Sequence, residues 1–430
     1  MNGAQALLRT LVDGGVDVCF GNPGTSEMHF VAALDAVPEM RGVLCLFEGV
    51  ATGAADGYGR MTGRPAGVLL HLGPGLANGL ANLHNARRAA TPMVPVVGDH
   101  AGYHKQYDSP LDSDIDALAG TVSRWVRRSG TSAHVAVDAA EAIAAARTAP
   151  GGIATLILPA DVSWSEGALP AAPQPAGAPR PVPEDVVAGV AAVLTSGDEC
   201  AVLVGGAATR EPGLRAAGRV ARAAGAALFC ETFPARLERG AGLPPVERLP
   251  RSGQQVAARL AGVRHLVCFG ARPPVEFFAY PDRPSSLVPE GCEVHVLAEG
   301  ADDVVGALDR LADLVAPGVE PDLQPLDRPE LPTGPLTADA VGAALGALLP
   351  EGAVVVDEGV TSTRQMPFPT AGAPRHDWLT LTGGAIGQGL PVATGAAVAC
   401  PGGGSSASRA TAAPCTRSRR CGPRRASGST

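Results

Sequence analysis

The chain has 430 residues, is 46% hydrophobic with only 4% aromatic residues, and carries a formal net charge of −8 at pH 7. This length predicts more than one domain, and the acidic balance does not support nucleic-acid binding. No apolar run approaches the roughly 18 residues of a membrane helix. The N-terminus lacks the basic segment of a signal peptide. Nine scattered Cys without a CxxC pair favour a reducing cytoplasm over a zinc site or a disulfide framework.

Residues 1–165 alternate between apolar strand-like runs and helix-like segments, which is typical of a parallel α/β sheet. Strands are predicted at residues 16–20, 43–47, 67–70, 93–99 and 153–159. The turn Asn22-Pro23-Gly24 follows the first strand, and Thr25 or Ser26 can cap the next helix. A second glycine-rich turn, His71-Leu72-Gly73-Pro74-Gly75, follows the third strand. Several such turns at the carboxyl edge of one sheet predict a cofactor crevice.

Glu48 is the main catalytic candidate because it directly follows the apolar run at residues 43–47. A buried strand that ends in a carboxylate points that group into the crevice at the carboxyl edge of the sheet. A carboxylate held there against apolar neighbours can exchange a proton with a ligand nitrogen. The small residues at 49–60 predict a tightly packed helix after Glu48. The alternative is a solvated Glu at a strand end.

Proline-rich linkers at residues 169–184 and 317–335 divide the rest of the chain. Between them, strands predicted at 201–206, 226–230, 265–270 and 293–297, with a helix at 212–223, indicate a second parallel α/β domain. After the second linker we expect a helix at 338–349 and strands at 353–358 and 378–381. A glycine-rich segment at 382–391 follows.

Three motifs carry a family resemblance: F-G-N-P-G-T-S-E at 20–27, F-E-G-V-A-T-G-A-A-D-G-Y-G-R at 47–60, and H-L-G-P-G-L-A-N at 71–78. Together they resemble the pyrimidine-binding domain of thiamine-diphosphate enzymes, in the branch of acetolactate synthase large subunits and benzoylformate decarboxylases. The resemblance implies the thiamine-diphosphate-binding fold, with a pyrimidine-binding domain at 1–165, a middle α/β domain at 185–316 and a partial diphosphate-binding domain at 336–400.

The resemblance also assigns roles on the pyrimidine side. The family residue at the position of Glu48 hydrogen-bonds a ring nitrogen of the aminopyrimidine and promotes loss of the thiazolium C2 proton, after which the cofactor attacks a 2-keto acid and carbon dioxide leaves. His71 would assist protonation or bind the substrate carboxylate, the alternative being a structural His. Pro23, Thr25 and Asn78 would lie near the cofactor, although Asn78 can also serve only the helix start.

On the diphosphate side, the resemblance places Thr361 and Ser362 near the diphosphate. Gly384 would offer its carbonyl to the aminopyrimidine amine, and Ile386 would bend the cofactor; an ordinary core residue is the alternative for Ile386. Residues 271–278 depart from the FAD-binding pattern of acetolactate synthases, so FAD is not inferred. Phe278 occupies the position of a catalytic His of benzoylformate decarboxylases, which argues against that activity.

Residues 401–430 hold six Arg, no acidic residue and none of the larger apolar side chains, which predicts disorder. The family's Mg²⁺ motif, G-D-G followed by N-N, should begin here, yet no Asp, Glu or Asn follows Asp377, so no metal ligand is assigned. One explanation is a natural disordered tail. We favour an out-of-frame, truncated end: with one nucleotide restored near codons 401–402, residues 405–430 can be decoded with G-D-G-S-A and an amphipathic helix.

The resemblance implies a thiamine-diphosphate- and Mg²⁺-dependent 2-keto acid decarboxylase or carboligase, most similar to acetolactate synthase large subunits. In this family the site forms between two chains, so we expect a homodimer or tetramer acting on a small-molecule 2-keto acid. With the metal motif missing, we expect weak or absent cofactor binding, poor solubility and an inactive chain. The alternatives are a benzoylformate-decarboxylase-like enzyme for aryl or branched 2-keto acids, and a non-catalytic subunit that pairs with an intact paralogue.

Overall fold

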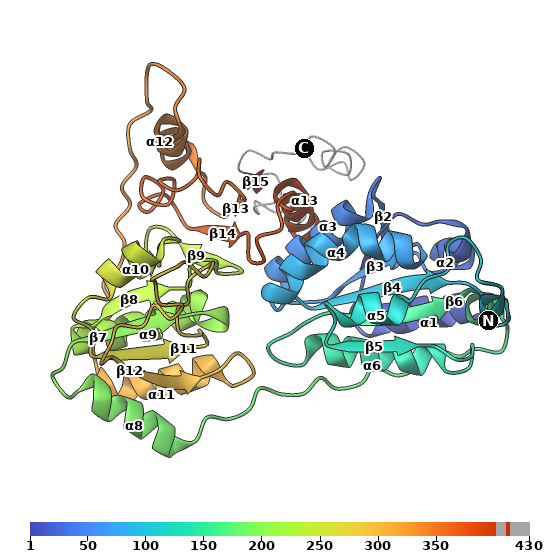
Figure 1. Ribbon diagram of the computed structural model, residues 1–430, viewed down its shortest axis with the longest axis horizontal. Helices are drawn as coiled ribbons and strands as arrows, with labels where there is room; N and C mark the ends of the chain where they lie inside the picture. Colours follow the sequence, from blue (N-terminus) through green and yellow to red (C-terminus); the bar gives the residue numbers. More distant parts are fainter. Residues whose placement is uncertain (401–409, 413–430) are drawn as a thin grey trace. The chain divides into compact units, whose positions relative to one another are not determined.

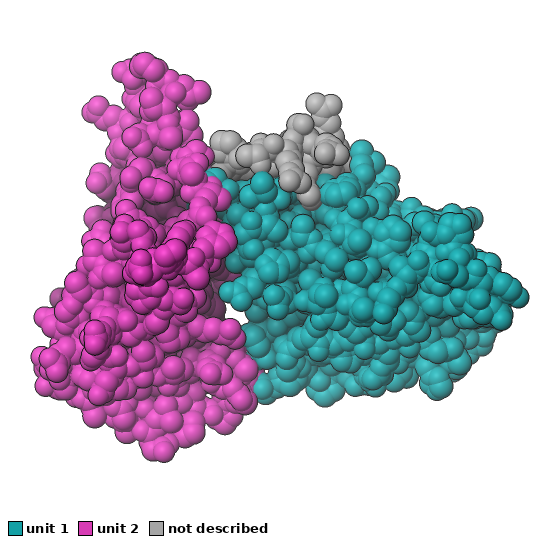
Figure 2. Space-filling view, in the orientation of Figure 1, with its two compact units in different colours: residues 1–178, 354–359, 381–430 teal, residues 179–353, 360–380 magenta. Residues whose placement is uncertain are grey.

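A computed structural model describes residues 1–400 and 410–412 of the chain (Figure 1). It contains two compact units, shown in different colours in Figure 2. Unit 1 comprises residues 1–178, 354–359 and 381–430, and unit 2 comprises residues 179–353 and 360–380. Each unit is built on a parallel sheet with flanking helices, so the expected α/β class is confirmed.

Unit 1 contains a six-stranded sheet in the order β2-β1-β3-β4-β6-β5, in which every neighbouring pair is parallel. Its strands are β1 (Val18–Gly21), β2 (Arg41–Leu44), β3 (Ala66–Leu70), β4 (Met93–Asp99), β5 (Trp125–Arg128) and β6 (Ala154–Pro159). The helices are α1 (Gly3–Asp13), η1 (Thr25–Glu27), α2 (Met28–Ala36), α3 (Glu48–Thr62), α4 (Leu72–Arg88), η2 (Gly102–Tyr107), α5 (Ile115–Gly120), α6 (Val135–Arg147) and α7 (Ala160–Trp164).

Helices cover both faces of this sheet, as a parallel sheet requires. Tyr58 of α3 and Leu76 of α4 belong to the apolar core on one face. Leu7 of α1 and Phe30 of α2 belong to the core on the other face. Two sealed faces leave the strand ends as the accessible edges of the sheet, which is where a ligand site can form.

The expected strand at residues 43–47 is corrected by the structure. Strand β2 ends at Leu44, pairs only with β1 and lies at the edge of the sheet, while Leu46 is 72% exposed. The reason is register: Leu44 pairs with Gly21, the last residue of β1. The Cys45 amide still donates to the Gly21 carbonyl at 2.8 Å, but β1 has no further residue with which the strand pairing could continue. Glu48 therefore does not close a buried strand but begins α3 after a short connection.

Unit 2 contains a five-stranded parallel sheet in the order β10-β8-β7-β11-β12. Its strands are β7 (Cys200–Val204), β8 (Ala227–Cys230), β10 (Glu247–Arg248), β11 (His265–Phe269) and β12 (Glu293–Ala298), and β9 (Leu237–Arg239) separately pairs antiparallel with β14 (His376–Thr380). The helices are α8 (Glu184–Leu194), η3 (Gly206–Thr209), α9 (Glu211–Ala224), α10 (Gly253–Arg259), α11 (Val304–Val315) and α12 (Ala338–Leu348).

The C-terminal segment does not form a compact unit of its own. Strand β13 (Ala353–Asp357) and helix α13 (Gly389–Ala399) lie essentially in unit 1, whereas residues 360–380 belong to unit 2. The three domain ranges expected from the sequence therefore stay a prediction.

Within the predicted disordered tail, Ala410–Ala412 instead form β15, which pairs parallel with β13. Backbone pairing to an available strand edge needs no apolar side chain, which explains how so polar a segment can supply a strand. The other residues of that tail lie outside the described part of the chain. Among the described residues, no helix is both long and apolar enough to cross a bilayer.

Helix α3 packs against α13 through small residues. A Cβ atom at Gly57 would overlap the Val392 carbonyl oxygen, and one at Gly395 would overlap the Ala54 carbonyl oxygen. Glycine thus allows the two helix backbones to approach closely. On another side of α3, Tyr58 donates to Asp17 at 2.8 Å. As a result, every residue of α3 from Glu48 to Arg60 is buried.

Candidate active site

Glu48 lies at the N-terminus of α3 with 7% of its surface exposed. Its two carboxylate oxygens each accept a hydrogen bond from a side-chain amide. Nδ2 of Asn22 lies 3.1 Å from Oε1, and Nδ2 of Asn78 lies 3.1 Å from Oε2. The helix N-terminus adds a favourable field for negative charge. The carboxylate is therefore held by neutral donors, with no Lys or Arg bonded to it in the described structure.

The three residues of this hydrogen-bonded group come from different elements. Asn22 directly follows β1, and Asn78 lies in the second turn of α4. Of the residues expected near the cofactor, Asn78 is thus placed against Glu48. Pro23 and Thr25 lie on the same turn as Asn22, where Pro23 is half-buried and Thr25 is exposed at the start of η1.

His71 precedes α4 and contacts a buried carboxylate, Glu27. Nδ1 of His71 lies 2.8 Å from Oε2 of Glu27, whose side chain is fully buried. Glu27 also accepts from the Gly24 amide at 2.7 Å and from the Ser26 hydroxyl at 2.6 Å. Because a carboxylate is an acceptor, Nδ1 of His71 is the protonated nitrogen, which leaves Nε2 as an acceptor when the ring is neutral.

Glycines allow this group to form. A Cβ at Gly24 would overlap the His71 ring, and one at Gly98, near the end of β4, would overlap the Glu27 carboxylate. The turn is also strained: Leu72, the first residue of α4, has φ +48°, in the left-handed region that a branched side chain rarely adopts. Such strain costs on the order of 1–3 kcal/mol and persists only where the surroundings enforce it.

Glu48 and His71 flank a single glycine. A Cβ at Gly75 would lie 3.3 Å from Cβ of His71 and 3.6 Å from Oε1 of Glu48. The structure therefore brings the two catalytic candidates to one place at the carboxyl edge of the sheet. Such an arrangement combines a hydrogen-bonded carboxylate with an imidazole that is oriented by a second carboxylate, which is a set suited to proton transfer.

Gly384 and Ile386 lie on a segment that is fixed to α4 of the same unit. Asn85 donates to the Ala385 carbonyl at 2.8 Å and accepts from the Ala385 amide at 3.1 Å. Gly384 has φ +74°, a conformation that glycine adopts without strain. Ile386 is 44% exposed, so the alternative of an ordinary core residue does not describe it.

The same segment is held at its other end by a buried carboxylate. Glu358 accepts hydrogen bonds from the backbone amides of Gly387 and Gly389 at the start of α13. An acceptor at the start of a helix satisfies backbone donors that the helix itself cannot use. Residues 382–389 are thus fixed at both ends within unit 1, with Gly384 and Ile386 on the exposed side.

The remaining candidates lie in unit 2. Thr361 and Ser362 are exposed turn residues. Phe278 is 58% exposed, and its ring centroid lies 4.9 Å from that of Phe277. The structure describes these residues without placing them in the Glu48 site.

Sequence reasoning overlooked Glu27 and Asn22 as members of the site. Both stand in the motif at residues 20–27, so a signal was present. An acid three residues after Gly24 is also a pattern in which its side chain returns to the start of a helical turn, and Glu27 does so. The contact with His71, 44 positions away, depends on the neighbouring placement of β1 and β3.

Comparison with known proteins agrees with this architecture. Residues 1–119 match the family described as thiamine pyrophosphate enzyme, N-terminal TPP binding domain. Over 403 residues the chain is 66% identical to "Putative acetolactate synthase large subunit IlvX" of Mycobacterium tuberculosis. The aligned region covers 93% of this chain and 77% of that protein. The chain is also 27% identical over 417 residues to benzoylformate decarboxylase of Pseudomonas aeruginosa. That aligned region covers 90% of this chain and 76% of the relative.

Two solved structures share the fold. The thiamine diphosphate-dependent 4-hydroxybenzoylformate decarboxylase of Rhodococcus jostii RHA1 superposes with a TM-score of 0.80 at 23% identity, covering 93% of this chain and 79% of that one. Benzoylformate decarboxylase of Polynucleobacter necessarius gives a TM-score of 0.75 at 21% identity, covering 93% and 78%. At these identities the likeness establishes the fold.

Proposed function

The chain belongs to the family of thiamine pyrophosphate-dependent enzymes related to acetolactate synthase large subunits, and from this premise we propose that its site serves the decarboxylation and carboligation of 2-keto acids. The observation that carries the proposal is the position of Glu48. It is a buried carboxylate beside the glycine-rich turn at 73–75, and Asn22 and Asn78 each donate a hydrogen bond to it. A proton-transferring group needs this combination of fixed position and access to a ligand.

The residues of unit 1 fit the pyrimidine end of thiamine diphosphate. Glu48 would present one carboxylate oxygen to a ring nitrogen, and its bond to Asn22 or Asn78 would keep the other oxygen in place. Pro23 and Thr25 would border this end, and the exposed Gly384 and Ile386 would approach it from the segment fixed to α4. When bound, the cofactor supplies the electron sink for loss of carbon dioxide from a 2-keto acid.

His71 would act on the substrate in this proposal. Glu27 fixes the ring with Nδ1 donating, so Nε2 would be the nitrogen left to hold or release a proton for a ligand. Ser26, whose hydroxyl also lies 3.2 Å from Nδ1, restricts the ring further. When protonated, Nε2 would bind a substrate carboxylate or deliver a proton to product carbon, and when neutral it would accept a proton, which are the two roles of a general acid–base group.

The chain offers fewer ligands for Mg²⁺ and for the diphosphate group of the cofactor. Mg²⁺ takes oxygen ligands from carboxylates, amides and water, and residues 378–430 contain no Asp, Glu or Asn. Thr361 and Ser362 offer hydroxyls to a diphosphate but no negative charge for the ion. We therefore propose that this polypeptide binds thiamine diphosphate weakly and has little activity. We also propose that the chain forms a homodimer or tetramer, but a second copy brings no Asp, Glu or Asn after residue 377 and so does not replace the missing Mg²⁺ ligands.

Calorimetry with thiamine diphosphate and Mg²⁺ tests the cofactor proposal. The chain of the printed sequence should show no binding in the micromolar range, and micromolar affinity would refute the proposal. A version with one nucleotide inserted at codons 401–402, hereafter the restored-frame chain, should bind and release carbon dioxide from a 2-keto acid. A restored-frame chain that folds and binds cofactor but leaves every 2-keto acid unchanged would instead favour a non-catalytic subunit.

A second candidate is a simple decarboxylase for aryl 2-keto acids. The His71–Glu27 pair favours it, because a histidine beside the site can protonate a product carbon and end the reaction without a carboligation step. Product analysis of the restored-frame chain separates the two candidates. Acetolactate from pyruvate supports the first proposal, and benzaldehyde from benzoylformate without acetolactate supports the second.

A further inference from the structure

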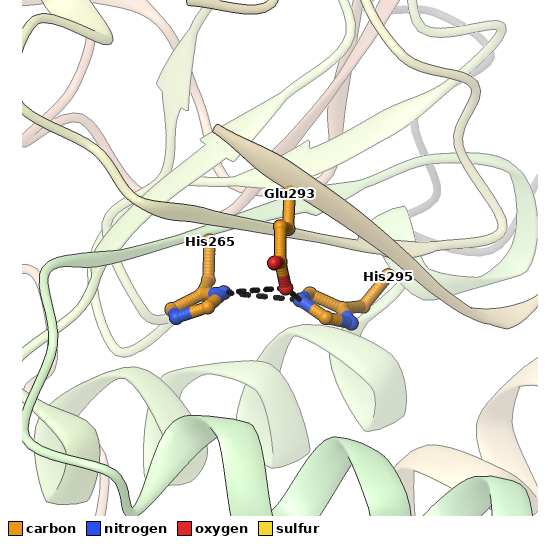
Figure 3. Close-up of side chains that lie close together, drawn as sticks. All are labelled: His265, Glu293 and His295. Atoms are coloured by element: carbon orange, nitrogen blue, oxygen red, sulfur yellow. Dashed lines mark hydrogen bonds and ion pairs between the residues drawn. The ribbon is translucent and has the colours of Figure 1, made fainter. Parts of the chain in front are cut away.

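Two histidines and a glutamate meet in unit 2, far along the chain from the site described above. His265 is the first residue of β11, and Glu293 and His295 are the first and third residues of the neighbouring strand β12. The parallel register pairs His265 with Glu293. Figure 3 shows the three side chains converging from the two strands.

The ligand atoms of the three residues lie as close together as those around a bound metal. Nδ1 of His265 lies 3.1 Å from Nε2 of His295, and each nitrogen lies 3.8 Å from Oε2 of Glu293. Zinc bonds to nitrogen and oxygen are about 2.0–2.2 Å long, so two ligands of a tetrahedral ion lie about 3.3–3.6 Å apart. The observed separations bracket that value without any movement of the backbone.

We propose that His265, Glu293 and His295 bind one divalent transition-metal ion of the zinc type. Two imidazoles and one carboxylate are ligands that such ions accept readily. Three protein ligands leave one tetrahedral position for water. The sequence carries no CxxC pair that would mark this site, because its histidines come together only through the pairing of β11 with β12.

The surroundings of His265 support the proposal independently of the three ligands. Its other ring nitrogen, Nε2, lies 3.5 Å from Oδ2 of Asp198. Metal-binding histidines almost always direct their second nitrogen to a carboxylate, carbonyl or water, which sets the tautomer and the ring orientation. Asp198 thus favours the tautomer in which Nδ1 of His265 carries the free lone pair.

His295 can take part through Nε2, which lies 3.1 Å from Nδ1 of His265. A metal binds an imidazole through a ring nitrogen that carries a free lone pair. A plain hydrogen bond between the two histidine rings is the competing explanation for the 3.1 Å contact, and it requires neither Glu293 nor an ion.

The position on the sheet indicates a structural ion. The cluster lies at the amino ends of β11 and β12, whereas ligands of parallel sheets bind at the carboxyl ends. Strand β12 is the last strand of the five-stranded sheet. An ion between β11 and β12 would fasten this edge strand to the sheet, so bound metal should raise the stability of unit 2 without entering the chemistry.

The test uses the full chain without an affinity tag and without thiamine diphosphate, so its outcome is independent of the proposed enzymatic function. Zn²⁺ binding is measured by calorimetry, and Co²⁺ is added as a spectroscopic probe. The expected result is one ion per chain, with the visible absorption of tetrahedral Co²⁺ and a higher melting temperature in Zn²⁺. The variants His265→Ala, His295→Gln and Glu293→Gln should each weaken binding at least about tenfold.

Two matched controls separate this cluster from adventitious binding. His134→Ala and Glu290→Gln replace exposed residues of the same types and should bind like the unmodified chain. Glu293 is 72% exposed at its side chain, so Glu293→Gln should keep the fold even if a histidine variant does not. Failure of the unmodified chain to bind, or equal binding by Glu293→Gln and Glu290→Gln, would overturn the proposal and leave a hydrogen bond between histidines.

Discussion

His71 and Glu27 lie on different strand-to-helix turns, yet Nδ1 of the histidine is 2.8 Å from a carboxylate that has no exposed surface. The pair joins the ends of β3 and β1, which are neighbours in the sheet. Its geometry fixes both the tautomer and the direction of the imidazole. Any role of His71 in proton transfer consequently depends on Glu27, which acts as its positioning residue.

Replacement of Glu27 by Ala should destabilise unit 1. The substitution leaves the Gly24 amide, the Ser26 hydroxyl and His71 without their common acceptor, and a buried donor without a partner costs about 1–3 kcal/mol. Chemical denaturation measures the loss. Glu39→Ala, at an exposed position in the same half of the domain, should change the free energy of unfolding by no more than about 0.5 kcal/mol. Equal effects of the two variants would show that Glu27 is not a structural acceptor.

Replacement of Glu48 by Gln should remove catalysis and keep the fold. Gln has nearly the same shape, and its one oxygen can still accept from Asn22 or Asn78, but it cannot exchange a proton. In the restored-frame chain, release of carbon dioxide from a 2-keto acid should fall at least about 100-fold, with an unchanged circular dichroism spectrum. Glu39→Gln is the control. Retention of full activity by Glu48→Gln would remove the basis of the proposed function.

Replacement of Gly395 by Ala should weaken the packing of α13 on α3. The added methyl group would overlap the Ala54 carbonyl oxygen, and overpacking of this kind costs about 1–3 kcal/mol. Gly189→Ala on α8 is the control, since nothing lies within 4 Å of its Cβ position, and it should stabilise by about 0.5–1 kcal/mol. Thermal unfolding compares the two. Stabilisation by both would mean that α13 is not held by this contact.

His376 should make unit 2 sensitive to acid. Burial, together with the nearby Arg239 guanidinium, lowers the pKa of His376 to about 3, against about 6.5 in an unfolded chain. The unfolded state therefore binds more protons between these values, and stability falls as the pH drops below about 6.5. The loss is about 1.4 kcal/mol per pH unit, or roughly 2–3 kcal/mol by pH 4.5.

The variant His376→Gln checks this pH dependence. Nδ1 of His376 donates to the Pro374 carbonyl at 2.8 Å, and a Gln amide can keep that bond while losing the titration. Unfolding free energies of the variant measured from pH 7 to pH 4.5 should decline less steeply than those of the unmodified chain. His134→Ala, at an exposed position, should follow the unmodified curve. Parallel slopes for His376→Gln and the unmodified chain would contradict the assignment.

The alternation of apolar runs and glycine-rich turns predicted most of the fold. Strand β4 was expected at residues 93–99 and is observed there, and helix α9 differs from its expected range by one residue at each end. These elements are defined by local patterns, an unbroken apolar run and a helical segment of suitable length. Strand β5 was missed because Arg127 and Arg128 interrupt its apolar character, and its position depends on pairing with β6.

The candidate site was predictable only in part, because some of its contacts depend on how elements that are distant in the sequence pack together. Glu48 is buried near the glycines at 73–75 as expected, but at the start of α3 and not at the end of the buried strand from which the expectation was drawn. The amide groups of Asn22 and Asn78 could not be assigned to its two oxygens, because that pairing depends on how β1 and α4 approach α3. The end of β2 at Leu44 likewise depends on where its partner ends rather than on the apolar residues that follow.

Helix α3, enclosed from Glu48 to Arg60, makes the carboxylate at its start inseparable from its scaffold. Transfer of Glu48 into another protein would therefore require the whole of α3, together with the glycine at 57 that lets α13 pack against it. The side chain starts directly on this helix, so its position cannot be adjusted separately from α3. Differences in substrate preference would then have to arise in the neighbouring turns, while the position of Glu48 stays constant.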